Sequence, residues 1–148
     1  MITQIRQATE TDLDDVLALY AQPDMDDGQV MDLASAHKVF AEFARHPSYR
    51  LFLACDAQAQ VLGSYALLIM PNLAHRGTPS AVVEDVVVSP QHHGQGIGRQ
   101  MMSHAIRLAR EAGCYKLALS SNAKRASAHA FYHSLGFHLH GVSFSVDL

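Results

Sequence analysis

The chain has 148 residues, a formal net charge of −3 and a sequence pI near 6.3. A hydrophobic fraction of 49% with 17% charged residues excludes a disordered chain and predicts one folded domain, residues 1–148. The mildly acidic balance argues against nucleic acid as a partner, because a phosphate-binding surface usually makes a domain basic.

Hydrophobic periodicity and turn residues divide the first half of the chain into a strand, two helices and a strand pair. These elements are expected at residues 2–7, about 9–22, about 32–45, 50–55 and 61–70. A loop with the sequence Pro-Asp-Met-Asp-Asp-Gly, residues 23–28, separates the two helices.

The second half continues with a central strand at 81–88 and a long helix at 96–112, followed by a strand, a helix and a last strand. The last three are expected at 115–120, 123–135 and 137–146, with Gly113 and Gly136 ending the two helices. The order β-α-α-β-β-β-α-β-α-β predicts a mixed α/β fold with helices on both faces of one sheet.

A glycine-rich turn joins the central strand to the long helix. Ser89-Pro90 interrupts a run of valines, and Gly94, Gly96 and Gly98 follow at alternate positions. Such a turn exposes backbone N–H groups at a helix start, where they bind a phosphate or pyrophosphate. Neither the dinucleotide-binding fingerprint nor the Walker A loop fits, because Arg99 and Gln100 stand where those motifs need other residues.

Two blocks of the sequence resemble one known family. The spacing from His93 to Gly98 resembles the acetyl-coenzyme A loop of the GNAT superfamily of N-acetyltransferases, commonly Q/R-x-x-G-x-G/A, with His93 in the place of Gln or Arg. The family's late motif is roughly N-x-x-A-x-x-x-Y-x-x-x-G-F, and this chain matches it at Ala128, Tyr132, Gly136 and Phe137. Arg125 stands where Asn is frequent, and Asn122 lies one turn earlier.

The resemblance implies a GNAT-like sheet of six to seven strands and acetyl-CoA as the acyl donor. The pantetheine arm is then expected between residues 86–88 and the strand at 117–120. The residues expected to bind the coenzyme are Val86, Val87, Val88, His93, Gly94, Gln95, Gly96, Ile97, Gly98, Arg99, Asn122 and Arg125. Lys124 is a further candidate for the phosphates, and the N–H of Val88 is the implied donor to the thioester oxygen.

Amine acetylation requires a base, because a free alkylammonium has a pKa near ~10.4. Glu84 is the first candidate, since it lies in an otherwise apolar strand on one face with Val82 and Val86. Burial beside valines makes a carboxyl a better base near neutral pH. A β-bulge would exchange the roles of Glu84 and Asp85. A structural ion pair of Glu84 with Arg or His is the alternative interpretation.

Other groups complete the expected site. Tyr132 is the implied acid, which stabilises the departing thiolate of the coenzyme. His75 is a second candidate base. Asp24, Asp26 and Asp27 lie in the loop that borders the acceptor site in this family, and residues 71–75 are expected to form its other wall.

The sequence therefore predicts an N-acetyltransferase that acts directly on a primary amine of an unidentified small acceptor. A non-catalytic acyl-CoA sensor or interaction module on the same fold is the alternative, and a histidine-based metal protein, using His129 and His133, is a third. No metal site is expected. Cys55 and Cys114 belong to no motif, so a cysteine relay is not expected. The expected setting is cytoplasmic, with no membrane partner, and a homodimer is common in the family.

Overall fold

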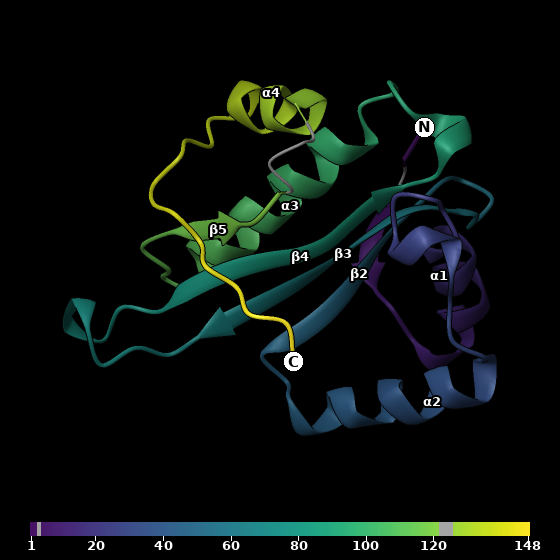
Figure 1. Ribbon diagram of the computed structural model, residues 1–148, viewed down its shortest axis with the longest axis horizontal. Helices are drawn as coiled ribbons and strands as arrows, with labels where there is room; N and C mark the ends of the chain where they lie inside the picture. The colour runs from purple at the N-terminus through teal and green to yellow at the C-terminus, as the bar shows by residue number, and fades with distance from the viewer. Residues whose placement is uncertain (3, 122–125) are drawn as a thin grey trace. The chain divides into compact units, whose positions relative to one another are not determined.

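The computed structural model describes residues 1–2, 4–121 and 126–148. The chain builds a five-stranded sheet in the order β1-β2-β3-β4-β5 (Figure 1). The strands are β1 (Gln4–Gln7), β2 (Tyr49–Cys55), β3 (Val61–Met70), β4 (Ser80–Val88) and β5 (Leu117–Leu119). The helices are α1 (Leu13–Tyr20), α2 (Leu33–Glu42), α3 (Ile97–Glu111) and α4 (Ala126–Ser134).

Contacts between residues divide the chain into two compact units, Met1–Ala118 and Leu119–Leu148. The first unit holds β1 to β4 and α1 to α3, and the second holds α4; β5 spans the boundary. A single domain over residues 1–148 stays a prediction. No helix among the described residues is long and apolar enough to cross a bilayer.

In the first unit, helices cover both faces of the sheet, as the sequence predicts. One core cluster joins Val16 and Leu19 of α1 to Leu51 and Leu53 of β2, and aromatic side chains of the α2 region pack against it. On the other face α3 packs so closely that a Cβ on Gly63 of β3 would lie 3.1 Å from the Met101 sulfur. Figure 1 shows α2 and α3 on opposite sides of β3 and β4.

The predicted count of six to seven strands and the predicted element order are wrong at the C-terminus. Residues 137–148, all of which the structure describes, form neither helix nor strand. The side chains of Leu139, Val142, Phe144 and Val146 are exposed. Alternation of apolar residues favours a strand, but a strand also needs a hydrogen-bonding partner, and alternation does not supply one.

β4 contains a β-bulge at the position that matters most for the site. Ala66 pairs with Glu84 and Ser64 pairs with Val87, so Tyr65 alone faces both Asp85 and Val86. Asp85 adopts a left-handed φ of 53°, which a non-glycine residue rarely adopts. The bulge changes the alternation of side chains beyond Glu84.

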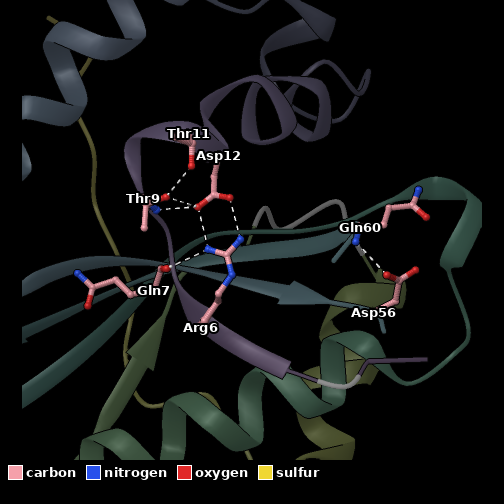
Figure 2. Close-up of polar contacts among 7 residues, drawn as sticks. All are labelled: Arg6, Gln7, Thr9, Thr11, Asp12, Asp56 and Gln60. Atoms are coloured by element: carbon pink, nitrogen blue, oxygen red, sulfur yellow. Dashed lines mark hydrogen bonds and ion pairs between the residues drawn. The ribbon is translucent and has the colours of Figure 1, made fainter. Parts of the chain in front are cut away.

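An ion pair fixes β1 to the turn that precedes α1 (Figure 2). The guanidinium of Arg6 donates two hydrogen bonds of 2.8 Å to the carboxylate of Asp12. The same carboxylate accepts a 2.7 Å bond from the backbone N–H of Thr9. These bonds lower the pKa of the buried Asp12 carboxyl to about 2, with the Arg6 hydrogen bond as the largest cause.

Candidate active site

The glycine turn has the backbone that the sequence predicts. Gly94 and Gly96 have left-handed φ angles of 77° and 82°, which suit glycine because it has no Cβ. A Cβ built on either would meet nothing within 4 Å, so the surface above the turn is open.

The start of α3 supplies the N–H groups. The first backbone bond within the helix is from Gln100 N–H to Gly96 O, so the N–H groups of Ile97, Gly98 and Arg99 precede the helical ladder. The side chain of Ile97 is buried, so only its backbone can face a ligand. This geometry fits a diphosphate on the amides.

The end of β4 presents one backbone edge beside the turn. Ser89 N–H donates to Leu62 O at 2.8 Å, so the next pair, Gly63 and Val88, is of the non-hydrogen-bonded type. The N–H and C=O of Val88 therefore point away from β3. Its oxygen accepts bonds of 3.0 Å from Gln22 Nε2 and His93 Nε2. Val87 differs, because its side chain lies in the core cluster.

The prediction that Glu84 is buried beside valines is wrong, because its side chain is exposed. The side of the sheet that Glu84 faces is partly as predicted. Glu84 pairs with Ala66 of β3, whose side chain lies in the core cluster on the α1 side of the sheet. Because of the bulge, Val87 rather than Val86 continues that face. None of the ion pairs found among the described residues involves Glu84.

Simple alternation places Asp85 on the face opposite to Glu84, but the bulge interrupts the alternation at Asp85. Both carboxylates act electrostatically on Tyr49, which packs against the core cluster on the α1 side. Asp85 is open to solvent, yet the surrounding protein restricts its hydration enough to raise the pKa of its carboxyl. The nearby Asp26 raises the pKa of Asp85 further.

Sequence reasoning misses the groups around Asp85. Burial, and then the charge of Asp85, raise the pKa of Tyr20 to about 12. The buried Ser64 lies close to the Tyr20 hydroxyl and opposes this rise in the pKa of Tyr20. Tyr20 reads as an apolar position of α1 and Ser64 as a strand residue. No local pattern in the sequence joins them to Asp85.

The second unit holds Tyr132, which lies on α4 with its side chain half-buried. Its ring contacts those of Phe131 and Phe137, with centroids 5.2 and 5.8 Å away. Gly136 ends this helix segment with a φ of 92°, as predicted. The candidates Asn122, Lys124 and Arg125 lie outside the described residues.

The remaining candidates have plain surroundings. Arg99 and Gln95 are exposed at the turn. His75 packs its ring on that of Tyr115, with the centroids 4.3 Å apart. Burial raises the pKa of the thiols of Cys55 and Cys114, which opposes a nucleophilic role. Within the described part of the chain, no group of three or more potential metal ligands gathers.

The fold is that of an α/β domain in which a strand leads through an open glycine turn into a long helix, and two neighbouring carboxylates, Glu84 and Asp85, lie on the same strand. The sequence model of the Acetyltransferase (GNAT) family matches residues 13–137. The chain belongs to this family, and by family it is an acetyltransferase.

Relatives agree with this assignment. A glucosamine 6-phosphate N-acetyltransferase from Trypanosoma brucei brucei is 35% identical over 60% of this chain, and the match spans 58% of that relative's length. An aminoalkylphosphonate N-acetyltransferase from Salmonella typhimurium is 32% identical over 92% of this chain and 85% of its own. The solved structure of a putative acetyltransferase from Agrobacterium tumefaciens superposes with a TM-score of 0.90, at 32% identity, over 98% of this chain and 99% of its own.

Proposed function

We propose that this protein transfers an acetyl group from acetyl-CoA to a primary amine of a small acceptor, by direct attack. The observation that carries the proposal is the open turn at Gly94 and Gly96, followed by the start of α3. The relatives' names support amines as the acceptor class.

The coenzyme diphosphate is proposed to bind to the N–H groups from Gly94 to Arg99. Two left-handed glycines leave no side chain in the way, and the positive end of the α3 dipole favours an anion. His93 holds the turn to β4 through the Val88 oxygen. Arg99 is exposed beside the turn and adds positive charge. Backbone donors thus replace the Gln or Arg side chain that is usual at the position of His93.

A carboxylate of the pair Glu84 and Asp85 is proposed as the base, and the structure favours Asp85. The acceptor reaches the protein as an ammonium ion, so a carboxylate must take one proton before the nitrogen attacks. Restricted hydration raises the pKa of Asp85 above its usual value, which makes it a stronger base than an ordinary aspartate. The exposed Glu84 remains the alternative, and matched variants distinguish the two.

The acetyl group arrives as a thioester, whose carbonyl carbon accepts the amine and whose C–S bond then breaks. The Val88 N–H, which points away from β3, is proposed as the donor to the carbonyl oxygen. Tyr132 is proposed to donate a hydrogen bond to the departing thiolate. A thiol pKa near ~8.5 lies below that of tyrosine near ~10, so a hydrogen bond is easier than full proton transfer.

A matched pair of glycine variants tests the proposal. Gly94→Ala and Gly113→Ala both place a Cβ at a left-handed φ, 77° and 78°, in open space, and each costs roughly 1–2 kcal/mol of stability. Only Gly94→Ala should weaken acetyl-CoA binding, measured by calorimetry. Absence of binding by the parent protein at millimolar acetyl-CoA would overturn the proposal.

Thiol release across a panel of amines separates the enzyme from the acyl-CoA sensor. The enzyme releases free coenzyme A with at least one amine, whereas a sensor binds acetyl-CoA and releases none. A Cys55→Ala, Cys114→Ala double variant with unchanged turnover supports direct attack; complete loss of turnover would instead indicate a cysteine relay.

A further inference from the structure

A hydrogen bond between two side chains joins α3 to the middle of the sheet. The Tyr65 hydroxyl of β3 lies 2.7 Å from Nδ1 of His104 on α3. Tyr65 is fully buried and His104 is half-buried. The ring of Phe52 on β2 stacks on Tyr65 at 5.4 Å and meets the His104 ring edge-on at 5.1 Å. These two aromatic rings hold the imidazole in place, so its Nδ1 stays directed at the hydroxyl.

This hydrogen bond lies beside the contacts that position the start of α3. Gly63 precedes Tyr65 by two residues on β3, so both face α3. A Cβ on Gly63 would lie 3.1 Å from Met101 Sδ and 3.2 Å from Ile97 Cγ2. Ile97 is the first residue of α3, and its N–H belongs to the proposed diphosphate site. Because a helix is a rigid element, a shift at His104 also moves these N–H groups.

The buried hydroxyl decides which form of His104 fits. A neutral imidazole with its proton on Nε2 accepts at Nδ1 the hydrogen that Tyr65 donates. Among the described residues, the Tyr65 hydroxyl has no other hydrogen-bond partner. A protonated imidazole carries hydrogen on both nitrogens, so the hydroxyl would have to turn its own hydrogen towards apolar atoms. A buried donor without a partner costs free energy, so the neutral form fits the structure better.

The charges around His104 favour the same neutral form. Burial is the largest cause that lowers the pKa of His104, and the positive charges of Arg107 and then Arg50 lower it further. Arg50 of β2 places its guanidinium 5.2 Å from the centre of the Phe52 ring. Glu111 on α3 acts in the opposite direction, but its carboxylate accepts a 3.0 Å bond from Arg107. β3 adds no charge, because its tyrosine is neutral in this pH range.

We propose that the Tyr65–His104 hydrogen bond holds α3 in the position that binds acetyl-CoA only while His104 is neutral, so that coenzyme affinity falls as His104 takes up a proton. The inference rests on the proposed function, because it takes the glycine turn as the coenzyme site. His104 is a positioning residue, and no step of the acetyl transfer passes through it. Since coupling between two binding events is reciprocal, bound acetyl-CoA should also make His104 harder to protonate.

Calorimetric titration with acetyl-CoA between pH 7.5 and pH 5 tests the proposal. Over this range the dissociation constant of the parent should rise about fivefold more than that of His104→Asn. The Asn oxygen stands near the place of Nδ1 and accepts the Tyr65 hydrogen, but it does not titrate. Variants must be compared because the phosphate monoester of the coenzyme itself titrates near pH ~6. His46→Asn, which replaces an exposed histidine, is the matched control and should follow the parent.

Measurements on the unsubstituted protein avoid any effect of a substitution on folding. In an NMR titration, the midpoint of the His104 ring signals should lie lower with saturating acetyl-CoA than without it. Tyr65→Phe should raise this midpoint, because the neutral imidazole loses its donor. The stability that His104 contributes is full above its unfolded-state pKa near ~6.5 and is lost as pH falls towards the lowered folded-state pKa. Amide exchange in α3, corrected for its intrinsic pH dependence, should therefore speed up in acid.

The outcomes separate this inference from the proposed function. Equal pH dependence of acetyl-CoA binding in the parent and in His104→Asn overturns the inference and leaves the N-acetyltransferase intact. The same conclusion follows if the His104 midpoint is identical with and without acetyl-CoA. Failure of the parent and of both histidine variants to bind acetyl-CoA at any pH overturns the proposed function and the inference with it.

Discussion

His93 Nε2 lies 3.0 Å from the carbonyl oxygen of Val88, so the residue that opens the glycine turn hydrogen-bonds to the strand that leads into it. The oxygen can only accept, so Nε2 carries the proton. Gln22 donates to the same oxygen from just before the acidic loop, residues 23–28. One backbone carbonyl therefore holds both the proposed coenzyme side and the proposed acceptor side of the site.

The hydrogen bonds from His93 and Gln22 to the Val88 oxygen should affect the KM values of different substrates. His93→Ala removes a bond worth about 1 kcal/mol and should raise KM for acetyl-CoA about fivefold. Gln22→Ala loosens the acidic loop and should raise KM for the acceptor instead. Steady-state kinetics with each substrate varied in turn measures both. Identical effects of the two variants on both KM values would contradict this division.

Asp85→Asn should abolish most turnover and also stabilise the fold. The pKa of Asp85 is raised by restricted hydration and by Asp26, so its stability contribution is present at low pH and is lost as pH rises through the folded-state pKa. At neutral pH the charged form therefore destabilises the protein, and Asn removes that charge. Thermal unfolding should show a higher Tm at pH 7 and a smaller difference towards pH 4.

Glu84→Gln is the matched variant for the base. If Asp85 is the base, Glu84→Gln keeps most of the parent kcat. The rate of the parent protein should then fall at low pH as Asp85 takes up a proton. Because the pKa of Asp85 is raised, this fall should begin at a higher pH than an ordinary aspartate would give. A complete loss in Glu84→Gln, with full activity in Asp85→Asn, would assign the role to Glu84.

Asp12→Asn should remove an acid-sensitive part of the stability. The Arg6 hydrogen bonds, followed by those from Thr9, lower the pKa of Asp12 to about 2. Its contribution, on the order of 2 kcal/mol, is full above pH ~4 and is lost as pH falls towards about 2. Urea unfolding at pH 7, 4 and 2.5 measures it, with Asp14→Asn as control. A constant difference between Asp12→Asn and the parent at all three pH values would refute the assignment.

Gly63→Ala should destabilise the packing of α3 on the sheet. The new Cβ would lie 3.1 Å from Met101 Sδ, 3.1 Å from Val87 O and 3.2 Å from Ile97 Cγ2. The Met101 side chain can move, but the Val87 backbone cannot move cheaply, so a loss of about 1–3 kcal/mol is expected. Gly141→Ala, which meets nothing within 4 Å, is the control. Equal Tm values for the two variants would contradict this reading.

Tyr132→Phe should lower kcat more than it changes acetyl-CoA affinity, because the ring and its contacts with Phe131 and Phe137 remain while the hydroxyl is lost. The decrease in kcat should be smaller with an acyl donor whose thiol is a better leaving group. Unchanged kcat would reject the proposed role of the hydroxyl.

The glycine turn depends on interactions between residues that are close in the chain, so the sequence alone predicts it. Glycines are needed at Gly94 and Gly96 because their backbone is left-handed, and the periodicity of residues 97–111 gives a helix whichever strands lie beneath it. Both follow from interactions within a few residues, so the order of residues suffices to predict them.

Asp85 and the C-terminal segment depend on partners far away in the chain. Alternation along β4 places Asp85 opposite to Glu84, but the register shift between Ser64 and Ala66 creates a bulge that interrupts this alternation. Residues 137–146 alternate like a strand, yet form none. Register and pairing arise between segments, so they follow from the packing of the whole sheet rather than from either segment's own pattern.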